Sequence, residues 1–149
     1  MNAKMTDFQA AIGVEQMKRL PFFVGRRREI ASQYAKVLQG RAGIGFPRDL
    51  QERSHIFYRY IVRKKNSAPW LKNLQAAGLD AKKPVFKPLH RYLKLSDSRY
   101  PGTSLAAREA CSIPIYPSLT TEETSEIGCI LKESLEEKKK KTSRSYVEI

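Results

Sequence analysis

Cysteine and histidine are scarce in this 149-residue chain, and their scarcity excludes several kinds of site. The chain holds two cysteines, Cys111 and Cys129, and two histidines, His55 and His90. Neither cysteine has a companion Cys or His at the spacing of a metal site. The sequence therefore predicts no metal centre, and two reduced thiols rather than a disulfide.

Long apolar runs are also missing. No stretch approaches the roughly 18 apolar residues that a membrane span requires, and no apolar segment follows Lys4 as it would in a secretory signal. The hydrophobic fraction is nevertheless an ordinary 41%, with a mean hydropathy of -0.51. From these features we expect a globular cytoplasmic protein with no membrane partner.

Acidic residues are few relative to basic ones, with 15 Asp and Glu against 28 Lys and Arg and a formal net charge of +13. Part of the excess lies in the lysines at 138–141 and part in Arg26, Arg27 and Arg28. Such patches can contact phosphates by electrostatics alone. The alternatives are a solvated surface with a disordered tail, a phosphorylated small molecule or acidic partner, and nucleic acid. Nucleic acid is not favoured, because no aromatic platform or groove-reading helix accompanies the charge.

The first part of the chain has the pattern of a helix. Thr6 and Gln9 match a capping box, in which each side chain accepts from the backbone N–H of the other. Pro21 is expected to end this helix or to begin the next one. Between Thr6 and Pro21 the apolar residues fall on two stripes, which predict a helix buried on much of its circumference. These stripes are Ala10, Val14 and Met17, and Phe8, Ala11 and Ile12.

The rest of the chain mixes helices with short strands. Residues 55–62, HIFYRYIV, alternate in polarity and predict a strand. Further helices are expected over residues 70–77, over 103–110 with Thr103 as its cap, and after a cap at Thr120 or Thr121. Because strands and helices do not alternate regularly, we predict an α+β fold, a small and mainly antiparallel sheet with helices packed over it.

Residues that carry chemistry form no familiar catalytic motif. The sequence has no phosphate loop, nucleophile elbow, His-Glu-x-x-His or paired Cys motif. His55 heads the expected strand, where a surface or edge role is expected. His90 lies in the stiff, proline-bounded segment KPLHRY and is the better candidate for a site residue, because rigid loops often present functional groups. The residues by themselves identify no reaction.

Several segments in order resemble the PLP-dependent sugar aminotransferases of the DegT/DnrJ/StrS family. The first is NAKMTDFQAAIGVEQMKRL, and it is followed by the arginine-rich RRREIASQYAKVL. KPLHRYLKL resembles the family's Pro-Leu-His segment, and YPGTSLAAREACSIPIYPSLTTEE resembles its closing run. The similarity extends over about residues 1–135. Each motif alone is weak, but their common order makes the resemblance specific.

This resemblance implies the C-terminal small domain of a fold-type I PLP aminotransferase, truncated at its N-terminal side. In the family a large domain comes first and carries the lysine that forms the Schiff base with PLP. We therefore expect residues 1–135 to form the small domain and 136–149 to form a basic, disordered tail. The resemblance favours a gene fragment over a separate small subunit. We predict no catalytic residue here and no independent transamination.

The resemblance also implies roles for three residues in a complete enzyme. Asn2 matches the asparagine that contacts the PLP phosphate of the neighbouring subunit, and Lys4 replaces a nearby arginine, losing its bidentate geometry. His90 matches a histidine close to the keto-sugar nucleotide. The expected partner is a second copy or a full-length aminotransferase. The alternative is a non-catalytic binding or dimerisation module that binds anions through its basic surface.

Overall fold

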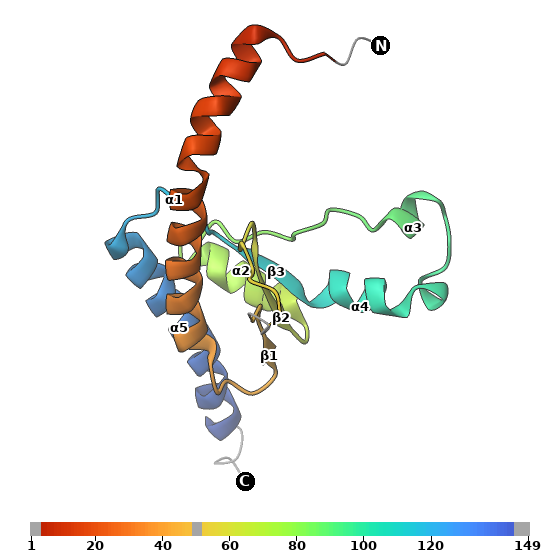
Figure 1. Cartoon of the computed structure of the whole chain (residues 1–149). Helices are drawn as coiled ribbons and strands as arrows, with labels where there is room; N and C mark the ends of the chain where they lie inside the picture. Colours follow the sequence, from red (N-terminus) through yellow and green to blue (C-terminus); the bar gives the residue numbers. More distant parts are fainter. Residues whose placement is uncertain (1–3, 49–51, 145–149) are drawn as a thin grey trace.

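A small antiparallel sheet forms the centre of the molecule in the computed structural model, which describes residues 4–48 and 52–144 (Figure 1). Its strands are β1 (Ile44–Gly45), β2 (Tyr60–Lys64) and β3 (Ala110–Ile113), in the order β1-β2-β3. Both strand pairs are antiparallel, and Tyr60 lies opposite Ile113. The expected α+β architecture with a small antiparallel sheet is confirmed.

Helices pack around this sheet and also extend away from it. They are α1 (Asp7–Leu38), α2 (Ser67–Ala76), α3 (Leu89–Tyr92), α4 (Pro101–Glu109) and α5 (Thr121–Arg144), with the short 3-10 helix η1 (Asp97–Arg99). The C-terminal half of α1 lies beside α5, whereas its N-terminal half projects from the body (Figure 1). Residues 84–109, which contain α3, η1 and α4, form a second projection that we call the arm.

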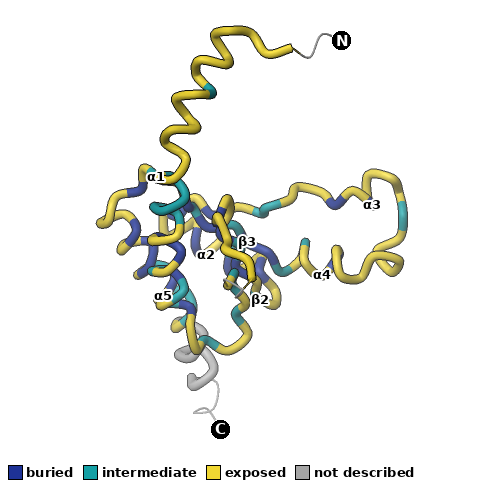
Figure 2. Tube along the Cα trace, viewed as in Figure 1, coloured by how far each residue is buried: buried dark blue, intermediate teal, exposed yellow. Residues whose placement is uncertain are grey.

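The hydrophobic core lies where the helices meet the sheet, and both projections are mostly exposed (Figure 2). Its fully buried side chains include Ile30, Tyr34, Leu38, Tyr60, Val62, Leu74, Cys111, Ile113 and Leu131. Burying one large apolar side chain stabilises a fold by about 1.5–3 kcal/mol. The core therefore holds β2 and β3 against α1, α2 and α5.

Pro21 neither ends the first helix nor begins a second one, so the predicted break is wrong. α1 runs through Pro21 without interruption, for 32 residues. A proline inside a helix removes one N–H donor and normally costs about 3 kcal/mol. Here the turn lies in the exposed part of α1, where water can bond the carbonyl that lacks its helical donor. The capping box at Thr6 and Gln9 is confirmed, with reciprocal hydrogen bonds of 3.0 and 3.3 Å.

The first residues of β2 and α4 also differ from the predicted ones. β2 begins at Tyr60 rather than at His55, because Phe57 adopts a φ of +47° and donates its N–H to His55 Nδ1 instead of to a strand. α4 begins at Pro101, so the cap predicted at Thr103 is wrong. Proline suits the first helical position because its missing N–H has no partner to lose there.

The last helix is capped as the sequence predicts but extends further. Thr120 Oγ1 accepts from the N–H of Glu123 at 3.1 Å, and the Glu123 carboxylate accepts from the N–H of Thr120 at 2.8 Å. The backbone of α5 then continues to Arg144, past the domain boundary predicted at residue 135. The division into a small domain and a disordered tail stays a prediction.

Candidate functional site

The predicted site residues do not meet in this chain. Asn2 lies outside the described residues. Lys4 is exposed just before α1, and His90 lies in α3. The N-terminal end of α1 and the α3 end of the arm are the tips of two different projections (Figure 1). A site that used both Lys4 and His90 would therefore need groups from outside one copy of this chain.

His90 is the centre of a polar cluster that ties the arm together. Its side chain is 4% exposed, and Nε2 lies 2.9 Å from Oδ1 of Asp97. The Asp97 carboxylate also accepts two hydrogen bonds from Arg91, at 2.9 and 2.7 Å. Tyr100 stacks on the imidazole with ring centroids 5.0 Å apart, and Ser104 Oγ lies 3.4 Å from Nε2. The cluster joins α3, η1 and α4 into one unit.

The electrostatics of the cluster keep Asp97 ionised. The hydrogen bonds from Arg91, and after them the one from His90, hold the pKa of the Asp97 carboxyl far below its usual range. The same pairing raises the pKa of Arg91. Donors that stabilise a carboxylate have this effect because they favour its charged form.

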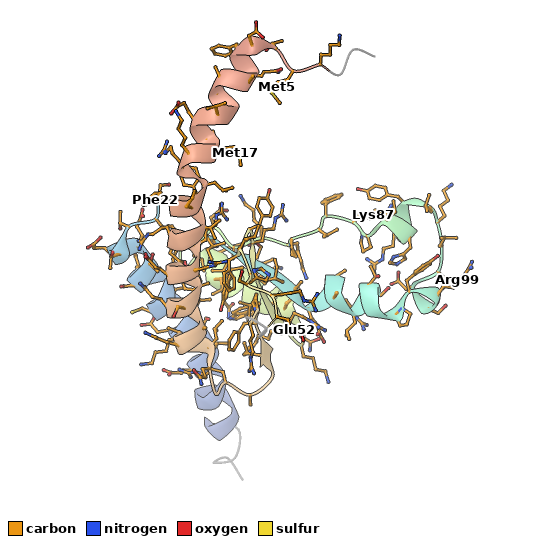
Figure 3. The ribbon with its side chains drawn as sticks, in the orientation of Figure 1. Met5, Met17, Phe22, Glu52, Lys87 and Arg99 are labelled. Atoms are coloured by element: carbon orange, nitrogen blue, oxygen red, sulfur yellow. The ribbon has the colours of Figure 1, made fainter. Side chains whose placement is uncertain are left out.

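The arm exposes an apolar surface beside its basic residues. Phe86 is 96% exposed and Leu89 is 71% exposed. The other exposed large apolar residues of this segment are Val85, Tyr92, Leu93, Tyr100 and Leu105. Lys87 and Arg99 mark two points along the arm in Figure 3, where side chains extend outward from the ribbon. So large an apolar surface is typical of a segment that is covered by another chain or domain.

The N-terminal half of α1 is exposed on every side, so the prediction of a mostly buried helix is wrong for this chain alone. Phe8 is 75% exposed, Met17 is 65% and Val14 is 56%. Met5 and Met17 mark this half in Figure 3, where no other segment lies alongside them, and α1 reaches the body at the level of Phe22. Both apolar stripes are present in the sequence, but nothing within the described residues covers them.

Arg26 and Arg27 make structural hydrogen bonds, whereas the sequence had left open a solvated surface or a patch that contacts phosphates. Arg27 Nη1 donates to the carbonyl oxygens of Phe57, Tyr58 and Ile115 at 3.2, 2.8 and 2.9 Å. Arg26 Nη2 donates to the carbonyl oxygen of Leu119 at 2.8 Å. Of the three arginines only Arg28 is exposed, and it too donates to a carbonyl oxygen, that of His55. Their main role is to connect α1 to loops.

None of the lysines whose side chains are described is fully buried, whereas a lysine that forms a Schiff base with PLP is a buried amine that can lose its proton. Among lysines whose side chains are described, Lys64 and Lys83 are partly buried and the others are exposed. Lys83 Nζ bonds to Ser67 Oγ at 2.9 Å and to the carbonyl oxygens of Ala107 and Arg108 at 3.3 and 3.1 Å. All three partners accept hydrogen bonds from Lys83 Nζ, so this side chain is tied to α2 and α4.

Other classes of site receive no support from the described residues. Within residues 4–48 and 52–144, no group of three or more His, Cys, Asp and Glu side chains could hold a metal ion. In the same part of the chain, no helix combines the length and apolarity needed to cross a bilayer.

A protein-family model identifies the chain. Residues 1–132 match the model of the DegT/DnrJ/EryC1/StrS aminotransferase family. The chain belongs to this family. It is 31% identical over 117 residues to the dTDP-4-dehydro-2,3,6-trideoxy-D-glucose 4-aminotransferase of Saccharopolyspora spinosa, which covers 76% of this chain and 30% of that enzyme. It is 28% identical over 123 residues to the dTDP-3-amino-3,4,6-trideoxy-alpha-D-glucose transaminase of Streptomyces venezuelae.

Solved aminotransferase structures have the same fold over part of their length. DesV of S. venezuelae superposes with a TM-score of 0.85 at 25% identity, over 91% of this chain and 38% of that one. The aminotransferase TlmJ of Streptoalloteichus hindustanus gives a TM-score of 0.77 at 28% identity, over the same shares. This aminotransferase-family chain therefore spans about a third of the length of its relatives, consistent with their C-terminal portion.

Sequence reasoning selected His90 but missed the residues around it. Asp97 lies seven residues later, and its carboxylate reaches the imidazole only after α3 and η1 fold back on each other. The one local signal was Ser96, whose side chain caps η1 and accepts from the N–H of Ser98. Such a cap indicates a turn, but it does not identify the side chain that meets His90.

Proposed function

We propose that this chain is the C-terminal portion of a PLP-dependent aminotransferase that acts on keto-sugar nucleotides in amino-sugar or polysaccharide synthesis. The observation that carries the proposal is the exposed first half of α1. This segment lies within the part of the chain that matches the family and has apolar residues on two stripes, yet nothing among the described residues covers it. A helix of that kind is stable when it packs against another domain or subunit.

By itself the chain is proposed not to transaminate. PLP supplies the aldehyde that holds the migrating amino group, and the protein must provide a buried lysine to bind it. The two partly buried lysines of the described chain are engaged elsewhere: Lys83 Nζ donates to Ser67 Oγ, and Lys64 Nζ lies 5.8 Å from the centre of the Trp70 ring. In the complete enzyme, Asn2 and Lys4 would contact the cofactor phosphate of the neighbouring subunit, and His90 would contact the sugar nucleotide.

A reduction experiment tests the predicted inactivity. The purified chain is incubated with PLP, treated with borohydride and digested for mass spectrometry. We expect scattered, substoichiometric labelling of exposed lysines. One lysine labelled stoichiometrically, or amino transfer to a dTDP-keto-sugar, would contradict the proposal.

A co-purification experiment tests the proposed pairing. The chain carries an affinity tag and is co-expressed with a full-length family aminotransferase, with which we expect it to form a stable complex. Val14→Asp should abolish the complex, because it places a charge on the exposed apolar surface. Lys36→Asp, on an exposed position of the packed half of α1, is the matched control. Equal recovery of both variants would contradict a role for the first half of α1.

The second candidate is a non-catalytic binding or dimerisation module. The net charge of +13 supports anion binding, and the exposed apolar projections support self-association. Light scattering of the chain alone would detect a dimer, and retention on immobilised DNA or sugar nucleotide over a salt gradient would detect anion binding. The cytoplasmic location stays a prediction.

A further inference from the structure

A cavity of about 380 Å³ lies beside the segment that leads into β2, and we call it the arginine pocket. This volume is sufficient for a small molecule, because ligand sites begin at about 300 Å³. The residues that line it are Arg48, Arg53, Ser54, His55 and Ile56. Glu52 marks this segment in Figure 3, on the body of the molecule rather than on either projection.

Two hydrogen bonds hold a third arginine beside this cavity. Arg28, on α1, donates from Nε to the carbonyl oxygen of His55 at 3.2 Å and from Nη2 to Ser54 Oγ at 2.9 Å. Both acceptors belong to residues that line the arginine pocket. A guanidinium group has five N–H donors, so three donors of Arg28 make no hydrogen bond within the described part of the chain. Three positive charges therefore lie at or beside one small cavity.

These three arginines form no ion pair among residues 4–48 and 52–144. The arginines that do pair with carboxylates there are Arg26, Arg41, Arg63 and Arg91. Arg48 instead lies against an aromatic ring, with its guanidinium carbon 5.3 Å from the centroid of Phe46. None of the residues that line the arginine pocket is acidic. Because like charges repel each other, a bound anion would stabilise this arrangement.

Phosphate is the anion that fits these donors best. Arginine presents paired N–H groups in a plane, which match two oxygens of a phosphate. A phosphate monoester carries about two negative charges near neutral pH, so it balances more of the positive charge than a carboxylate does. Ile56 lines the cavity and is 56% exposed, so it offers an apolar contact to an organic group attached to the phosphate. A nucleic acid fits less well, because it needs cations spread along many phosphates.

We propose that the arginine pocket binds the phosphate group of a phosphorylated small molecule through Arg28, Arg48 and Arg53. Arg28 also positions one wall of the pocket through its bonds to Ser54 and His55. The assignment uses none of the residues that the family resemblance associates with PLP or with the sugar nucleotide, and it does not rest on the proposed function.

Calorimetric titration of the purified chain tests the site. At low ionic strength we expect saturable binding of inorganic phosphate, and tighter binding of phenyl phosphate because it adds an apolar group. Arg48→Gln and Arg53→Gln should each weaken phosphate binding about tenfold, because each removes a charged donor. Arg99→Gln is the matched control, since it removes the same charge from an exposed arginine of the arm and should leave binding unchanged. Absence of saturable binding at millimolar phosphate, or equal weakening by all three substitutions, overturns the proposal.

Protection from an arginine reagent tests the same site in the wild-type chain, so it does not require any variant to fold. Phenylglyoxal modifies accessible guanidinium groups, and mass spectrometry identifies each modified arginine. We expect saturating phosphate to suppress modification of Arg48 and Arg53 but not of Arg99, and acetate at the same ionic strength to protect none of them. Equal protection of all three, or equal protection by acetate, overturns a phosphate site. Tight binding of a DNA oligonucleotide that displaces phosphate and falls steeply with salt would replace the small molecule by a nucleic acid, and so also overturns the proposal.

Discussion

Two neighbouring tyrosines in the core are expected to respond in opposite ways to loss of their hydroxyl groups. Tyr34 and Tyr60 are both fully buried, and their ring centroids are 5.3 Å apart in an edge-to-face arrangement. Tyr34 Oη donates to the carbonyl oxygen of Pro114 at 3.0 Å. Tyr60 Oη is buried and makes no hydrogen bond within the described residues.

The expected free energies follow from this difference. A buried polar group without a partner costs about 1–3 kcal/mol, whereas the small void left by one oxygen costs about 1 kcal/mol at most. Tyr60→Phe should therefore leave the free energy of unfolding unchanged or raise it by up to about 2 kcal/mol. Tyr34→Phe leaves the carbonyl of Pro114 without its donor and should lower the free energy of unfolding by about 1–3 kcal/mol.

Urea unfolding of the two variants and the wild-type chain provides the test. The midpoint concentration should rise or stay constant for Tyr60→Phe and fall for Tyr34→Phe, with the slope m unchanged in both. The two variants are isosteric and lie in the same part of the core, so each serves as the control for the other. Equal destabilisation by both substitutions would refute the reasoning, because it would mean that Tyr60 Oη has a partner such as a bound water.

Three further predictions concern other parts of the fold. Arg27→Met should destabilise the chain by about 2–4 kcal/mol in urea unfolding, because a charged donor to three carbonyls is lost; the exposed Lys36→Met should change stability by less than about 0.5 kcal/mol. Burial raises the pKa of the Cys111 thiol to about 11, so at pH 8 a thiol reagent should modify exposed Cys129 about 100-fold faster, and equal rates would contradict the burial. Thr120→Ala should cost about 1 kcal/mol by removing the cap of α5, whereas Thr120→Ser should retain it.

Local chemistry in the sequence was enough to locate most elements. The capping box at Thr6 and the cap predicted at Thr120 or Thr121 each need only residues within one helical turn, and the structure confirms the box at Thr6 and a cap at Thr120. The helix predicted over residues 70–77 is followed by Gly78, whose φ of +87° glycine adopts without strain. The break predicted at Pro21 was wrong because the free-energy cost of a proline inside a helix depends on whether water can reach the carbonyl left without a donor. The sequence alone does not show which part of a helix is exposed.

The sequence by itself thus determined the family, the α+β class and the choice of His90, since each depends on short motifs and their order. Only the tertiary structure decided that Arg26 and Arg27 bind carbonyl oxygens, and that Asp97 and Tyr100 enclose His90. The physical reason is that a side chain's role depends on what faces it, and those partners are brought together by chain folding. The tertiary structure also decided that the two apolar stripes of α1 are uncovered in this chain. A periodic pattern predicts that a helix face is apolar, but it does not provide the surface that buries that face.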